Sequence, residues 1–318
     1  MAFHLFQEIE EDLRSVEAEL NKQMETTHPT ITAASSHLLL GGGKRLRPAF
    51  VLLAGKLYNY QLNRLLPLAV ALEMVHMATL VHDDVIDESK TRRGIATVRA
   101  RWGNKISIHT GDHLFARALI LIAELGDSRI TQLLAKASVQ MCEGEIQQME
   151  STFNVNQSFR DYLYRINRKT ALLLSLSCQL GAMAVQAEPR AARTMKWYGH
   201  HLGMAFQITD DILDLVANEE ELGKPVGSDL RQGIMTLPIL TATVRDPLLK
   251  DLVHQKEKTE EEVKEAIERI VKTGAIEESK KVALLYLQKA KKELDHLPDS
   301  SVKESFHKIA DFIAQRNY

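Results

Sequence analysis

The sequence has few of the features that mark specialised protein classes. It contains 2 cysteines among 318 residues, Cys142 and Cys178, and their spacing fits neither a disulfide framework nor a metal site. Both lie in helical patterns, so we expect packed thiols. No stretch is rich in proline, glycine or serine, which leaves no linker at which to divide the chain. We therefore expect one domain over residues 1–318.

Strong charge and uninterrupted hydrophobic runs are also missing. The net charge of −2 gives no reason to expect nucleic acid as a partner. The most apolar long segment, 65–86, contains ionisable residues such as Glu73 and Asp83, which argues against a membrane span. The N-terminal segment is acidic and amphipathic, unlike a signal peptide. We expect a soluble, cytoplasmic protein.

The hydrophobic pattern predicts helices almost throughout. Apolar residues recur every three to four positions, and strict alternation is nearly absent. Several predicted helices are long, which favours an all-α bundle over a layered sheet fold. The expected helices cover 3–25, 30–40, 48–59, 64–88, 111–125, 128–153, 158–186, 189–218, 236–244, 259–272, 275–294 and 301–316.

Two clusters of aspartates are the most distinctive motifs. LVHDDVID contains Asp83, Asp84 and Asp87, and QITDDILD contains Asp210, Asp211 and Asp214, with Gln207 one turn earlier. In each cluster the first and last aspartates are four residues apart and so share a helix face. Carboxylates so close repel each other unless a cation lies between them. A solvated helix end is the alternative for either cluster alone, but two copies on two apolar helices favour a site.

The ligand type predicts the metal. Oxygen clusters without histidine or cysteine suit a hard cation such as Mg²⁺. Because Mg²⁺ takes one or two carboxylates together with substrate phosphates, two such faces looking at each other would hold a diphosphate through bridging ions.

Basic residues accompany both clusters. The segment GGGKRLRP places a glycine turn (41–43) before three cations, of which Lys44 and Arg47 can bind phosphate oxygens. Arg92 and Arg93 follow the first cluster. Each cation alone has a simpler explanation, either a helix cap or a surface charge.

Together these motifs resemble the trans-polyprenyl diphosphate synthase family. GGGKRLRP, DDVID, TRRG, the Lys169–Thr170 pair and QITDDILD occur in the family's order along nearly the whole chain. Phrases such as SCQLGAMA and GKPVGSDL are similar to the large catalytic components of bacterial two-component heptaprenyl diphosphate synthases. The resemblance implies one helical bundle of the isoprenoid-synthase type around a deep central cavity.

The resemblance also implies an activity. The enzyme would condense isopentenyl diphosphate onto an allylic diphosphate, farnesyl diphosphate in our expectation, in a Mg²⁺-dependent reaction. The product would be a long all-trans polyprenyl diphosphate, expected to be heptaprenyl, for quinone side chains such as that of menaquinone. The working form would be a homodimer or a pair with a small regulatory subunit.

The family's functional residues map onto residues of each motif. The six aspartates and Lys169 would form the catalytic set. The metal ligands would be Asp83, Asp87 and Asp210, supported by Asp84, Asp211 and Asp214. The allylic diphosphate would be bound by Arg92, Lys169 and Lys224, with Thr170 and Gln207 near the reacting carbons. The isopentenyl diphosphate would be bound by Lys44, Arg47, His76 and Arg93.

The family pattern also bears on the length of the product, and this sequence departs from the pattern at Ile234. Bulky residues at the positions of Ala78 and Thr79 cap the cavity in short-chain relatives, and both are small here, so we expect a long product. Val75 and Leu72 would continue the cavity wall. Ile234 stands where many relatives have lysine, which puts the diphosphate affinity in doubt more than the activity.

Two other function classes share some of these features. A terpene cyclase or a squalene-synthase-like enzyme also carries aspartate clusters, but usually without the glycine turn and its cations. A non-catalytic helical subunit tends to lose one aspartate cluster, and both clusters are intact here.

Overall fold

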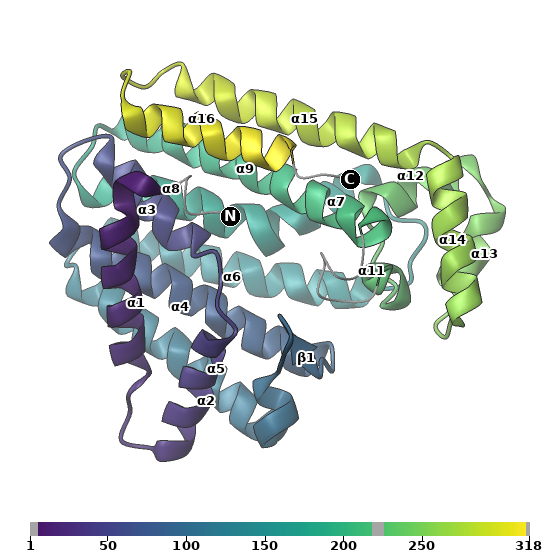
Figure 1. Cartoon of the computed structure of the whole chain (residues 1–318), viewed down its shortest axis with the longest axis horizontal. Helices are drawn as coiled ribbons and strands as arrows, with labels where there is room; N and C mark the ends of the chain where they lie inside the picture. Colours follow the sequence, from purple (N-terminus) through teal and green to yellow (C-terminus); the bar gives the residue numbers. More distant parts are fainter. Residues whose placement is uncertain (1–5, 218–225, 316–318) are drawn as a thin grey trace. The chain divides into compact units, whose positions relative to one another are not determined.

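The computed structural model describes residues 6–217 and 226–315, and these are almost entirely helical (Figure 1). They form two compact units. Unit 1 contains residues 6–135, 176–196 and 298–305. Unit 2 contains the described residues of 136–175, 197–297 and 306–315. Four of the five boundaries between the units (135/136, 175/176, 196/197 and 305/306) fall inside helices, and one domain over the whole chain stays a prediction.

Unit 1 is built on a buried central helix, α4. This helix packs along α5, and the two run side by side in Figure 1. The elements that begin in this unit are η2 (Gln7–Ile9), α1 (Glu10–Met24), α2 (Pro29–Leu40), α3 (Leu46–Lys56), α4 (Leu62–Ile86), β1 (Thr91–Arg92), β2 (Ile95–Ala96), α5 (Val98–Glu124) and α6 (Ser128–Ser151).

Apolar residues cover nearly the whole circumference of α4, as expected for a helix surrounded by protein. Within the described ranges it is the one helix long and apolar enough to cross a membrane. However, 67% of its most apolar window is buried inside the protein. That burial is the pattern of a core helix, in agreement with the expectation that 65–86 is not a span.

Unit 2 surrounds an apolar core that includes Tyr162, Ile208, Ile212, Met235 and Ile270. Within it, α13 and α14 contact each other and lie side by side in Figure 1. The remaining elements along the chain are α7 (Phe159–Ile166), η3 (Asn167–Ala171), α8 (Leu172–Ala184), α9 (Pro189–Val216), α11 (Ser228–Arg231), α12 (Leu237–Arg245), α13 (Leu248–His254), α14 (Glu260–Lys272), α15 (Ala275–Leu294) and α16 (Ser301–Ala314).

Several local features differ from the predicted helices, and α11 and α13 lie where no helix was predicted. Helix α5 begins at Val98, not near 111, because the Thr97 hydroxyl accepts the Ala100 N–H (3.1 Å) and Gly103 forms a kink at φ 79°, ψ 171°. The predicted helix 158–186 is interrupted by η3, a π-helical segment. A two-residue hairpin, in which Arg92 pairs with Ile95, was not predicted. Glycine alone adopts the Gly103 backbone readily, so it permits a break that hydrophobic periodicity does not reveal.

The two cysteines lie in different environments. Cys178 is fully buried, as predicted, and burial raises the pKa of its thiol. The prediction of a packed Cys142 is wrong, because this residue is exposed on the outer face of α6. That face also carries Val139, Ile146 and Met149, which are 56–58% exposed. The apolar periodicity of α6 therefore marks an outward-facing stripe as well as an inward one.

Candidate active site

The first aspartate cluster lies at the C-terminal end of α4 in unit 1. Asp87 follows the last residue of the helix, and its N–H donates to the Asp83 carbonyl (2.7 Å). Asp83 is partly exposed, Asp87 is exposed, and Asp84 is buried at 2%. The outer two carboxylates are thus accessible from solvent, whereas Asp84 points into the protein.

Asp84 already has a cationic partner. The Arg92 guanidinium donates to Asp84 Oδ1 through Nε (2.9 Å), and its NH2 atom lies 2.8 Å from the same oxygen. Burial raises the pKa of Asp84, and the neighbouring Asp87 raises it further, whereas Arg92 lowers it. The hairpin that follows α4 therefore returns Arg92 to the acidic helix end. The predicted role of Arg92 in diphosphate binding stays a prediction.

The glycine turn and its cations lie in the same unit. Gly42 has φ 62°, and its carbonyl accepts a hydrogen bond from the Arg93 guanidinium. Lys44 is exposed. Burial lowers the pKa of Arg47 to about 10, with Glu73 opposing and Arg93 reinforcing that shift. Arg47 therefore stays cationic at neutral pH.

A cleft of about 510 Å³, part of which is open solvent, joins the turn to the end of α4. Its lining includes His76, Glu73, Asp84, Arg92 and Arg93. Burial lowers the pKa of His76 well below its usual value, and the arginines around it act in the same direction. Its imidazole is therefore neutral at pH 7 and can donate one N–H. The structure brings two of the four residues predicted to bind isopentenyl diphosphate, His76 and Arg93, to one cleft.

The residues predicted to determine the length of the product lie along the middle of α4. Leu72 and Val75 are fully buried, and Ala78 is 1% exposed. Thr79 is partly exposed, and its hydroxyl donates to the His76 carbonyl (2.8 Å). The polar group of Thr79 is thus satisfied by the helix itself, which leaves small or apolar surface along this stretch.

The second aspartate cluster lies near the C-terminal end of α9 in unit 2. Asp210 is partly exposed, whereas Asp211 and Asp214 are 4% and 1% exposed. The Asp214 carboxylate accepts the Asp229 N–H (3.0 Å), and its main-chain carbonyl accepts the Gly227 N–H (2.7 Å). Asp214 therefore ties the start of α11 to α9.

A chain of side-chain hydrogen bonds leads to Asp211. The Tyr162 hydroxyl donates to Asp211 Oδ2 (2.7 Å), and Gln207 Nε2 donates to Oδ1 (2.7 Å). The Thr170 hydroxyl in turn donates to Gln207 Oε1 (2.5 Å). Burial raises the pKa of Asp211 to about 6, although both hydrogen bonds oppose the shift. Sequence reasoning predicted Thr170, Gln207 and Asp211 but missed Tyr162.

The π-helical segment η3 presents Lys169 to α6. Lys169 Nζ lies 3.4 Å from Glu145 Oε1 and donates to Gln148 Oε1 at 3.3 Å. A π turn inserts one extra residue into a helix, which is common at functional sites. Lys224, the other cation predicted in this part of the chain, lies outside the described residues.

The segment around Ile234 is held by main-chain contacts. The Ile234 N–H donates to the Asp229 carbonyl (2.8 Å), and the Gly233 carbonyl accepts the Phe153 N–H (2.8 Å). Buried Arg165 donates to the Met235 carbonyl (2.5 Å) and to Gln157 (2.7 Å). The side chain of Ile234 is apolar and offers no ligand for a phosphate oxygen.

The aspartate carboxylates fit a magnesium ion that also binds substrate phosphates better than they fit a metal ion bound by protein atoms alone. Among the residues of 6–217 and 226–315, no three His, Cys, Asp or Glu side chains are grouped closely enough for a metal site. Asp83 and Asp87 are one pair of accessible carboxylates without a closed cage, which matches the way Mg²⁺ binds together with substrate phosphates.

Comparisons with known proteins agree on one family. The polyprenyl synthetase family matches residues 28–270. The chain is 46% identical to "Heptaprenyl diphosphate synthase component 2" of Geobacillus stearothermophilus, over 98% of this chain and 97% of the relative. It superposes on the crystal structure of heptaprenyl diphosphate synthase from Staphylococcus aureus with a TM-score of 0.93, at 40% identity, over 98% of this chain and 99% of that chain. For the Caulobacter crescentus polyprenyl synthase complexed with calcium and isoprenyl diphosphate, the TM-score is 0.95 at 35% identity, covering 100% of this chain and 98% of that chain.

Proposed function

Because the chain belongs to the polyprenyl synthetase family, we propose that it condenses isopentenyl diphosphate onto an allylic diphosphate to make a long all-trans polyprenyl diphosphate. Family membership makes it an enzyme that transfers prenyl groups. The observation that carries the proposal is the pair of aspartate clusters, each near the end of a long apolar helix. Neither a terpene cyclase nor a non-catalytic subunit is favoured by any contact in the described residues.

The proposed product is heptaprenyl diphosphate, built on farnesyl diphosphate. Two relatives that match 98% of this chain are named as components of heptaprenyl diphosphate synthases. The small, buried Ala78 and the small Thr79 are compatible with a cavity deep enough for a long chain. A side chain of this length serves membrane quinones, so we assign the enzyme to menaquinone biosynthesis in the cytoplasm.

Magnesium is the proposed cofactor. Asp83, Asp87 and Asp210 would hold it, and the buried Asp84 and Asp211 would fix the helix ends around these ligands. When bound, Mg²⁺ stabilises the negative charge that develops on the departing diphosphate. The calcium in the Caulobacter crescentus relative supports a divalent cation in this family.

The chain's own residues have three tasks in this mechanism. Arg92, Lys169 and Lys224 bind the allylic diphosphate and attract its charge as the carbon–oxygen bond breaks. The allylic cation left after the diphosphate departs lies near the hydroxyl of Thr170 and the amide of Gln207. The buried apolar side chains of α4 exclude water, which would otherwise quench that cation.

Isopentenyl diphosphate is held by the second set of cations. Arg47 and Arg93 supply positive charge, and neutral His76 donates one N–H to a phosphate oxygen. The isopentenyl double bond attacks the allylic cation, a carbon–carbon bond forms, and a proton leaves the adjacent carbon. No described side chain at these positions is an obvious strong base, so we assign the proton to the released diphosphate.

The proposal includes an unlike partner. Relatives named "component 2" imply a second component, and we propose that this chain pairs with a small regulatory subunit. A homodimer is the alternative, which the assembly measurements described below would distinguish.

Replacing one aspartate from each cluster tests the proposed site. We expect Asp83→Ala and Asp210→Ala, made separately, each to lower kcat/KM by about 100-fold or more, since each would remove stabilisation of the leaving group. Product formation from labelled isopentenyl diphosphate measures the loss, and circular dichroism checks folding. Asp251→Ala, on the exposed surface of α13, is the matched control. Near-normal condensation by either cluster variant would reject the metal assignment.

A further inference from the structure

Arg45 has an unusual backbone and no assigned role. It directly precedes α3 and adopts left-handed dihedral angles, φ 46° and ψ 40°. Non-glycine residues rarely adopt this conformation unless the surrounding structure imposes it. Its side chain is 9% exposed, so it lies away from solvent, unlike the exposed Lys44 next to it.

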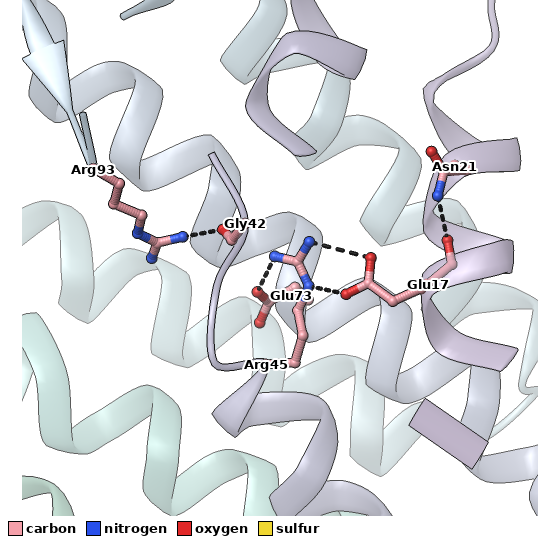
Figure 2. Close-up of polar contacts among 6 residues, drawn as sticks. All are labelled: Glu17, Asn21, Gly42, Arg45, Glu73 and Arg93. Atoms are coloured by element: carbon pink, nitrogen blue, oxygen red, sulfur yellow. Dashed lines mark hydrogen bonds and ion pairs between the residues drawn. The ribbon is translucent and has the colours of Figure 1, made fainter. Parts of the chain in front are cut away.

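Carboxylates from two helices hold the Arg45 guanidinium (Figure 2). Glu17 of α1 accepts hydrogen bonds from Nε and from NH2, the latter at 3.2 Å. Glu73 of α4 accepts one from NH1 at 3.2 Å. Every nitrogen of the guanidinium thus donates to a carboxylate, and its planar fork spans α1 and α4.

The same turn has a second anchor. The Arg93 guanidinium donates to the Gly42 carbonyl, as Figure 2 shows. A Cβ built on Gly43 would lie 2.9 Å from the NH1 atoms of both Arg45 and Arg93. The glycine turn is therefore enclosed by two arginines, one bonded to the turn itself and one to the helices beneath it.

Glu73 supplies negative charge among these cations. It is 4% exposed and lines the cleft together with Arg45 and Arg93. Its charge opposes the lowering of the pKa of Arg47 and of Arg93 that burial causes. Without an anion here, three neighbouring arginines would repel each other whenever no diphosphate is bound.

We infer that Arg45, Glu17 and Glu73 form a positioning clamp that holds the 41–43 turn and its neighbours Lys44 and Arg47 in the geometry that binds isopentenyl diphosphate. The clamp residues act through the turn and do not touch the substrate. The inference rests on the proposed function, because it assigns the clamp to the isopentenyl subsite. A merely structural ion pair would stabilise the fold without selecting between the two substrates.

Hydrogen exchange tests the clamp without any substrate. In Arg45→Lys an ammonium replaces the fork and cannot bond both carboxylates in the same way. We expect faster exchange of the peptide covering 39–49 in the ligand-free Arg45→Lys chain than in the unaltered chain. Asn21→Ala is the matched control, because Asn21 is an exposed neighbour on α1 that bonds only the main chain of Glu17 (2.8 Å). Unchanged exchange in Arg45→Lys would overturn the clamp.

Steady-state kinetics, measured with the proposed partner subunit present, test whether the clamp affects one substrate more than the other. We expect Arg45→Lys to raise KM for isopentenyl diphosphate by about tenfold while KM for the allylic diphosphate changes by less than about twofold. Glu17→Gln keeps the shape of a partly exposed residue, should fold normally, and should raise the first KM by about threefold.

The outcomes of these experiments distinguish a failure of the clamp from a failure of the proposed function. An equal rise in both KM values, or a lower KM for isopentenyl diphosphate in Glu73→Gln, would overturn the clamp, since the first indicates general damage and the second a competing anion. If the unaltered chain with its partner makes no polyprenyl product, the proposed function fails, and the exchange experiment still decides whether the turn is clamped.

Discussion

Some buried ionisable side chains in this protein are held by neighbours that lie far away in the sequence. Asp211 bonds Tyr162, 49 residues earlier, and Arg45 bonds Glu17 and Glu73, each 28 residues distant. Because an unpaired buried charge is costly, these partners are required wherever the ionisable group is enclosed. They define local geometry at the site as strictly as the motif residues do.

His201 should make stability depend on pH. Its ring lies against Trp197 (centroids 5.8 Å apart) and Tyr286 (6.1 Å), and burial lowers its pKa from 6.5 to about 4. Below pH 6.5 the unfolded chain takes up a proton that the folded chain refuses, so stability falls as the pH drops from about 6.5 toward 4. Allowing for its partial exposure, we expect a loss of about 1–2 kcal/mol in the free energy of unfolding.

Urea unfolding at pH 7.5 and pH 4.5 measures this effect. His201→Gln should reduce the difference in unfolding free energy between the two pH values by that amount. His296→Gln, at an exposed position, should leave the difference unchanged. An identical pH difference in His201→Gln and the unaltered chain would contradict the assignment.

Motif spacing marks the candidate site residues but does not reveal their hydrogen-bonding partners. The DDxxD spacing and the glycine turn mark Asp83, Asp210 and Arg47 directly, because chemistry requires those residue types there. Tyr162 and Glu73 carry no such signal, since one aromatic residue and one glutamate on apolar helices look like ordinary core and surface residues. Only the folded chain brings them to Asp211 and Arg45.

Helices in this protein were predictable where periodicity is uniform. The bounds of α4 and α15 follow from their apolar pattern within a few residues. The pattern misses the start of α5, where Gly103 changes direction, and the π turn of η3, because neither alters hydrophobicity. One of these interruptions bears on the proposed site, since η3 carries Lys169 and Thr170.

The size of the side chain at position 78 in α4 should determine the length of the product. Ala78→Phe places a bulky ring at a position that is now 1% exposed, so we expect shorter polyprenyl chains. Chromatographic sizing of dephosphorylated products measures the change. Ala78→Ser nearly preserves the volume and should leave the product unchanged. An unaltered product from a folded Ala78→Phe variant would reject the cavity-floor assignment.

At the scale of the whole molecule, the family and the all-α fold were both predictable from the sequence. Five motifs in order, spread over nearly the whole chain, suffice for the family, and helical periodicity suffices for the fold class. Assembly is different, because an amphipathic helix has the same pattern whether its outer face meets solvent or a partner. The exposed apolar residues on α6 illustrate that ambiguity.

The isolated chain should turn over slowly. If the catalytic conformation needs a small regulatory subunit, adding that subunit should raise product formation by roughly tenfold or more, because it shifts the population toward the competent state. Parallel light-scattering after gel filtration should show a mixed complex. Full activity of the chain alone, as a homodimer, would contradict the two-component proposal.

The contrast between the two cysteines has a practical consequence. A maleimide dye reacts with accessible thiols, so it will attach to Cys142 and leave the enclosed Cys178 untouched. The natural sequence thus offers one attachment point for a fluorophore, without mutagenesis, on the outward face of α6. Changes in the polarisation of that dye would report when another protein arrives at this helix, in real time and at nanomolar concentrations.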